Sequence, residues 1–181
     1  MLELENTVLV LVDVQGKLAQ LMYEKDALFE NLCKMIRGAK VLQIPILWLE
    51  QIPENLGPTV PEVARPMPDG LQPISKSSFS GWGEDRFVQA FKSLNRGQVL
   101  ITGIETHICV YQTAADLLAE GQYEVQVVAD CVSSRTAGNR DIGLEKIRNA
   151  GGFLTSVETV LFELQKKAEG PEFKELIRIV K

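Results

Sequence analysis

The run TVLVLV at residues 7–12 limits the fold more than any other stretch of this sequence. All six residues are β-branched or leucine, and none carries a charge. A strand that is apolar on both faces is typical of the middle of a parallel sheet. Asp13 follows directly, so we expect it at the carboxyl end of a central strand, where open α/β sheets bind their ligands. A turn-forming aspartate is an equally good interpretation of the same residue.

Strand-like and helix-like segments alternate along the rest of the 181-residue chain. Short apolar runs predict further strands at residues 46–49, 72–76, 99–102, 124–129 and 153–155. Apolar residues at helical spacing predict helices at residues 24–43, 84–95, 106–120 and 139–150, a short helix ending near Glu163, and a terminal helix opened by Gly170-Pro171. This alternation predicts a Rossmann-like three-layer α/β/α fold with five or six parallel strands, formed by residues 1–181 as a single domain.

Proline is concentrated in residues 50–70, at Pro53, Pro58, Pro61, Pro66 and Pro68. Proline fixes φ and removes a backbone donor, which argues against helix or central strand in this stretch. We expect a structured loop that forms a rim or lid of a binding site.

Composition argues against several classes of function. Lys and Arg number 19 and Asp and Glu 24, so the net charge of −5 gives no support to nucleic-acid binding. The apolar runs are too short to span a membrane, and the N-terminus lacks the basic start of a signal peptide. Three cysteines and one histidine suggest neither a disulfide framework nor a zinc site. We therefore expect a cytoplasmic protein and, since no Gly-rich phosphate motif occurs, no nucleotide cofactor.

Cys109 stands where chemistry is possible. The predicted strand 99–102 breaks at Gly103, and a helix follows with Thr106 as its expected N-cap and Cys109 in its first turn. Unpaired backbone N–H groups and the helix dipole lower a cysteine pKa there and favour the thiolate. A small buried cysteine without a reactive role fits this stretch equally well.

Three predicted strand ends bring Asp13, Lys76 and the 103–109 turn to one edge of the sheet. Lys76 can stabilise a thiolate, and Asp13 can exchange protons with a leaving group. The backbone N–H groups of Glu105 and Cys109 lie in the region that would hold an oxyanion. A solvated surface position is the commoner fate of a lysine.

Aromatic residues follow Lys76 closely. Phe79 and Trp82 lie among small residues, and this pair can wall a pocket or anchor the loop. Pocket specificity is expected from Gln15, Phe79 and Trp82, together with the proline-rich loop and a neighbouring subunit.

Three motifs in order resemble the isochorismatase-like cysteine hydrolases, a family that includes nicotinamidases, N-carbamoylsarcosine amidases and isochorismatases. The motifs are LVDVQ at residues 11–15, KSSFS at residues 76–80 and GIETHICV at residues 103–110. The resemblance covers residues 7–162 and is nearest to the isochorismatase-domain-containing proteins of poorly defined activity.

This resemblance implies a catalytic triad of Asp13 as acid/base, Lys76 as thiolate stabiliser and Cys109 as nucleophile. It also implies a cis peptide bond at Ile104-Glu105 that aims the Glu105 N–H into the oxyanion hole, and a homodimer or homotetramer. Nicotinamidases carry metal-binding histidines near the second strand. Residues 48–53 here contain none, so no metal is expected.

The resulting expectation is a hydrolase that cleaves an amide, carbamoyl or imide C–N bond of a small molecule through a thioester. True isochorismatases lack the cysteine, so the presence of Cys109 favours this substrate class. The alternatives are hydrolysis of an isochorismate-like vinyl ether by Asp13 and a non-catalytic subunit that has kept the fold. No cofactor, nucleic acid or membrane partner is expected.

Overall fold

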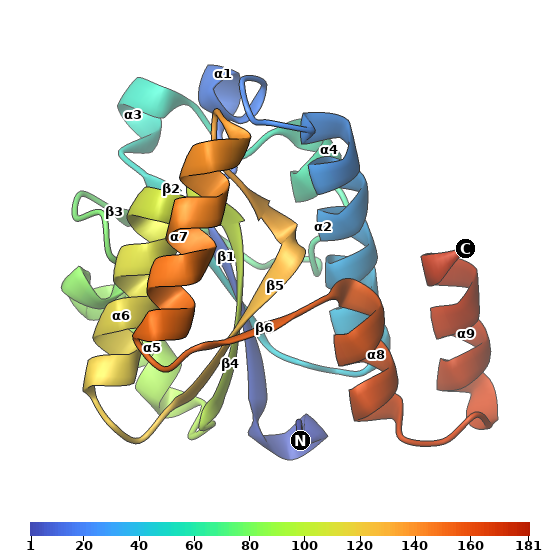
Figure 1. The fold of residues 1–181 in the computed structure, drawn as a ribbon. Helices are drawn as coiled ribbons and strands as arrows, with labels where there is room; N and C mark the ends of the chain where they lie inside the picture. The colour runs from blue at the N-terminus through green and yellow to red at the C-terminus, as the bar shows by residue number, and fades with distance from the viewer.

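Six parallel strands form one sheet in the computed structural model, which describes residues 1–181. The strand order is β3-β2-β1-β4-β5-β6, so β1 lies at the centre between β2 and β4 (Figure 1). The strands are β1 (Thr7–Val12), β2 (Ile46–Gln51), β3 (Ile74–Lys76), β4 (Gln98–Ile104), β5 (Glu124–Ser133) and β6 (Phe153–Thr155). The predicted parallel α/β architecture is confirmed.

Helices cover both faces of the sheet (Figure 1). The helices are α1 (Gly16–Ala19), α2 (Lys25–Val41), α3 (Pro53–Leu56), α4 (Pro61–Ala64), α5 (Asp85–Ser93), α6 (Tyr111–Ala119), α7 (Ala137–Asn149), α8 (Val157–Gln165) and α9 (Gly170–Val180). Short segments η1 (Leu4–Asn6), η2 (Gly81–Gly83) and η3 (Thr106–Val110) complete the chain. None of the helices has both the length and the apolar character that crossing a membrane requires.

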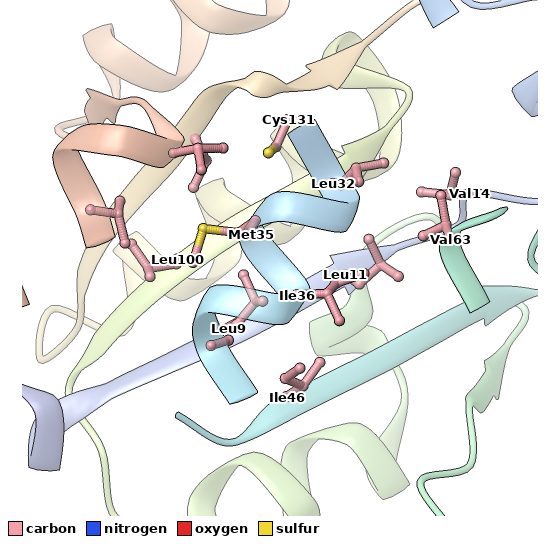
Figure 2. Packing of buried hydrophobic residues seen from close by; sticks show 14 of the residues in the cluster. Leu9, Leu11, Val14, Leu32, Met35, Ile36, Ile46, Val63, Leu100 and Cys131 are labelled. Carbon is pink, nitrogen blue, oxygen red and sulfur yellow. The ribbon is translucent and has the colours of Figure 1, made fainter. Parts of the chain in front are cut away.

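The central strand β1 is buried on both faces, as its sequence predicts. Leu9 and Leu11 point to one side, where they join a core built from α2, α8 and α9. Figure 2 shows this packing, with Leu32 and Ile36 of α2 against the strand. The alternate β1 residues join a second core with α5, α6 and α7. Burial on both faces fixes β1 in place, and with it the residue that follows.

The proline-rich segment differs from the sequence prediction. Two one-turn helices, α3 and α4, lie within it, although no helix was expected. Pro53 and Pro61 stand at the first position of these helices. A proline is tolerated at that position because its missing N–H would have no partner inside the helix.

Three strands, β2, β4 and β5, extend beyond their predicted carboxyl ends. β5 runs to Ser133, so Asp130 lies inside the strand and not at its carboxyl end. The Asp130 carboxylate accepts from the backbone N–H of Val157 at the start of α8. The next helix, α7, begins after its N-cap Thr136.

Gly103 does not break β4, which continues to Ile104. Its φ of 112° lies in a region that side chains rarely adopt, and a Cβ there would stand 2.0 Å from the Val12 carbonyl oxygen. The absence of a side chain therefore lets β4 stay paired with β1 up to the residue before the site.

Gly103→Ala tests this close approach. The added methyl meets backbone atoms and an unfavourable φ, so we expect the free energy of unfolding to fall by about 3–5 kcal/mol. Gly138→Ala is the matched control, since a Cβ at that helical position meets nothing within 4 Å. It should change stability by less than about 1 kcal/mol. Urea denaturation measures both, and equal stability of the two variants would contradict the packing described.

Candidate active site

Asp13, Lys76 and Cys109 meet at the carboxyl edge of the sheet. Asp13 follows β1, Lys76 is the last residue of β3, and Cys109 lies in η3 directly after β4. The Lys76 Nζ stands 2.6 Å from Asp13 Oδ2, and both side chains are almost fully buried. Asp13 and Cys109 line the same small cavity.

The Lys76 ammonium is fully occupied by oxygen acceptors. Besides Asp13, it donates to Gln51 Oε1 at 2.7 Å and to the carbonyls of Ser78 and Phe79 at 3.1 Å. An ammonium has three protons, so these four acceptors leave none for another group. The lysine therefore joins the ends of β1, β2 and β3 to the loop after β3.

Asp13 presents one engaged oxygen and one free oxygen. Oδ2 accepts from Lys76, whereas the buried Oδ1 has no hydrogen-bond partner. Burial raises the pKa of the Asp13 carboxyl, and the adjacent ammonium opposes that increase. A carboxylate with a raised pKa and an open oxygen is well suited to take up and return a proton.

The Cys109 thiol does not have the lowered pKa that its position in the sequence predicted. Burial raises its pKa to about 12, the Asp13 carboxylate adds to the increase, and Lys76 opposes it. The predicted helix start is also wrong. The chain passes through the short π-helical segment η3 before α6, with Glu105 and not Thr106 as N-cap. The Thr106 hydroxyl is buried without a partner.

Glu105 lines the cavity, and its backbone amide has no partner within the protein. The Glu105 carbonyl accepts from Ile108 and Val110 but not from Cys109. The Ile104-Glu105 peptide bond is cis, as the family resemblance implied. The Glu105 carboxylate accepts from both the backbone N–H and the Nε of Arg135 at 3.1 Å. The residue is thus held by its side chain while its amide stays available.

The cavity beside Cys109 has a volume of about 100 Å³. Its lining consists of Asp13, Leu18, Gln51, Leu56, Phe79, Ile104, Glu105, Ile108 and Cys109. Five of these nine side chains are hydrocarbon. Phe79, with 56% of its surface exposed, stands at the rim.

Gln15 and Trp82, two of the three expected substrate-binding residues, do not line this cavity. The buried Gln15 amide bonds the backbone of Gln51 and the Gly57 carbonyl, and so holds the proline-rich segment against β2. Trp82 packs edge-on against Phe91 and Tyr123 and anchors its loop, which was the alternative interpretation.

Several lining residues and the partner of Glu105 are not evident from the sequence. Gln51 pairs with Lys76 in the β2–β3 register at a strand end, and extending the predicted strand 46–49 by two residues would have found it. Leu18 and Leu56 come from one-turn helices that carry no clear signal. Nothing in the sequence pairs Arg135 with Glu105.

No cluster of three or more His, Cys, Asp or Glu side chains is arranged to hold a metal ion. In the stretch where nicotinamidases have histidines, Glu50 is the one carboxylate. Its Oε1 accepts from both the N–H and the hydroxyl of Thr59.

Comparison with known proteins gives one consistent family. Residues 7–159 match the model of the isochorismatase domain. The chain is 37% identical over 181 residues to the secreted isochorismatase effector Isc1 of Phytophthora sojae, covering 97% of this chain and 85% of that protein. It is also 37% identical over 180 residues to isochorismatase domain-containing protein 2 of Danio rerio, covering 99% and 89%.

Solved structures agree with the sequence relatives. The MAR1 ribonuclease of Caenorhabditis elegans has a TM-score of 0.92 and 31% identity, covering 99% of this chain and 91% of that one. The YcaC gene product of Escherichia coli, described as an octameric hydrolase of unknown specificity, has a TM-score of 0.90 and 25% identity, covering 98% and 89%. The resemblance drawn from the sequence motifs is confirmed.

The raised pKa of Cys109 predicts a thiol that stays protonated far above neutral pH. A pKa of about 12 means that the proton leaves only as the pH approaches that value, whereas an ordinary thiol loses it near pH 8.5. Ultraviolet titration of thiolate absorbance, taken as wild type minus Cys109→Ala, isolates this group from Cys33 and Cys131. A difference signal with its midpoint near neutral pH would contradict the effect of burial described here.

Proposed function

Because this chain belongs to the isochorismatase family, we propose that it is a cysteine hydrolase that cleaves the C–N bond of a small amide, carbamoyl or imide compound. Cys109 is the nucleophile, Asp13 the acid/base, and Lys76 the cation that holds Asp13 in place. The observation that carries this proposal is the unpartnered Asp13 Oδ1 in the same cavity as the Cys109 thiol.

The first half of the reaction forms a thioester. Cys109 Sγ attacks the substrate carbonyl carbon while Asp13 Oδ1 accepts the thiol proton, so a thiolate need not exist beforehand. The backbone N–H groups of Glu105 and Cys109 hold the oxyanion. When the tetrahedral intermediate collapses, the C–N bond breaks and Asp13 gives its proton to the departing nitrogen.

The second half releases the acid. Asp13, again ionised, takes a proton from water as the water oxygen attacks the thioester carbonyl. The C–S bond breaks, the thiolate recovers the proton from Asp13, and the carboxylic acid product leaves. The raised pKa of Asp13 supports proton transfer both to and from this residue, because burial makes its carboxyl hold a proton more firmly than an exposed aspartate does.

Lys76 acts on the thiol through its charge and not through a hydrogen bond. Its four acceptors leave it no proton for the thiol or the substrate. It acts by orienting Asp13 and by partly opposing the increase in the pKa of Cys109.

One observation favours the alternative of vinyl ether hydrolysis by Asp13. The raised pKa of its carboxyl is what protonation of such a substrate requires, and that reaction does not need the thiol. Activity that persists without Cys109 would select this alternative.

The ribonuclease activity for which the C. elegans protein is named is not proposed for this chain. The net charge of −5 is opposite in sign to the usual RNA-binding surface. We do propose a homo-oligomer, for which the octameric E. coli relative gives a precedent. We also propose a cytoplasmic location, with which the three free cysteines are compatible.

Cys109→Ala should abolish hydrolysis of any amide that the wild-type protein turns over. The nucleophile is lost, and a rate reduction of at least about 10⁴-fold is expected. A panel of amides and carbamoyl compounds, followed by ammonia release, identifies the substrate. Cys33→Ala is the matched control, because Cys33 lies outside the cavity and should keep wild-type activity. A purified Cys109→Ala protein that retains amide hydrolysis would refute the mechanism.

A further inference from the structure

Hydrocarbon makes up most of the wall of the cavity beside Cys109. Leu18 and Leu56 come from the one-turn helices α1 and α3, whereas Ile104 and Ile108 flank the Glu105 amide. Phe79 completes the rim. A substrate group that fills this space must lose most of its contact with water.

The polar side chains in the wall are engaged with the protein. Gln51 accepts from Lys76 with Oε1 and donates to the Ser77 carbonyl with Nε2. Glu105 directs its carboxylate to Arg135. Asp13 Oδ1 and the Glu105 amide stay free, and the proposed reaction uses both at the scissile bond. The wall therefore offers little to any second polar group of a substrate.

No cation is available to an anionic substrate. Two of the lining residues are acidic, Asp13 and Glu105, and none is basic. Lys76 lies behind Asp13 with its protons committed, and Arg135 pairs with Glu105 outside the lining. A carboxylate entering this cavity would lose its hydration and meet like charge without compensation.

The volume limits the size of the bound group. A dry cavity of about 150 Å³ accommodates benzene, which has six non-hydrogen atoms. On that scale the present cavity of about 100 Å³ holds about four non-hydrogen atoms, which is enough for a short alkyl chain beside the scissile carbonyl.

From these features we infer that the site takes uncharged amides with a short aliphatic acyl group and excludes substrates that carry a carboxylate. This inference rests on the proposed function and narrows its substrate class. It separates the chain from an enzyme for carboxylated substrates, which would need a cation in the wall.

Alkylation of Cys109 tests the charge selectivity without requiring turnover. Iodoacetamide and iodoacetate are nearly equal in size and differ in charge, and with either reagent the cysteine sulfur displaces iodide. Peptide mass spectrometry gives the rate at Cys109 for each reagent, in the folded protein and in the same protein unfolded in urea. We expect the ratio of the amide rate to the acid rate to be at least about tenfold higher in the folded state, because like charge and lost hydration oppose the acid.

Each outcome of this experiment has a definite meaning. An equal ratio in the folded and unfolded protein overturns the inference and leaves the proposed nucleophile intact, since Cys109 still reacts. Failure of both reagents to label folded Cys109, under conditions that label the half-exposed Cys33, contradicts the inference and the proposed function together.

A variant of the wall should weaken the expected preference. Leu56 is half-buried at the end of α3, so a longer side chain can be accommodated there. Leu56→Lys places a cation at the cavity and should lower the rate ratio toward the unfolded value, whereas Leu56→Met, the neutral control, should not. Equal ratios for the two variants would show that charge does not govern entry.

Hydrolysis rates for a neutral and a carboxylated amide test the charge selectivity and the hydrolase activity separately. Butyramide and succinamate differ in that a carboxylate replaces the terminal methyl group. We expect kcat/KM for succinamate to be lower by at least about a hundredfold. Preferred hydrolysis of succinamate overturns the inference alone. If Cys109 shows the alkylation preference but no amide is hydrolysed, the proposed function fails and the charge selectivity stands.

Discussion

The buried ion pair between Lys76 and Asp13 is the contact on which the candidate site depends. Moving either charge out of water is unfavourable by several kcal/mol, and one contact at 2.6 Å does not by itself offset both. The remaining protons of Lys76 therefore matter, because they bond Gln51 and two carbonyls of the following loop. Three segments that are distant in sequence, at Asp13, at Gln51 and at residues 76–79, are fixed together by a single ammonium.

This arrangement explains why a thiol with a high pKa is compatible with nucleophilic chemistry. The same burial that keeps Cys109 protonated also raises the pKa of Asp13, so burial increases the proton affinity of both groups. In the proposed reaction that proton moves to Asp13 only as the carbon–sulfur bond forms. The thiol therefore needs no lasting negative charge, because a proton acceptor stands in its own cavity.

Much of the fold could be predicted from the sequence, because local patterns determine it. The uncharged run before Asp13 can bury both of its faces only between two helical layers. The spacing of apolar residues identifies the buried face of α2. The positions of Asp13 and Lys76 follow from strand ends. The pKa of Cys109, the anchoring of Trp82 and the Glu105–Arg135 pair depend on side chains that pack from distant segments, and no local pattern encodes those contacts. Five prolines obscure the two short helices of this segment, because proline breaks a helix interior yet is tolerated as the first helical residue.

Covalent attachment of substrate to Cys109 is the central claim. Rapid acid quenching of the protein with a turned-over amide, followed by intact-mass and peptide mass spectrometry, measures it directly. The expected result is a transient increase in mass equal to the acyl group, confined to the peptide that contains Cys109 and absent in Cys109→Ala. Turnover with no acylated peptide at any quench time, and with the same rate in Cys109→Ala, would contradict the thioester route.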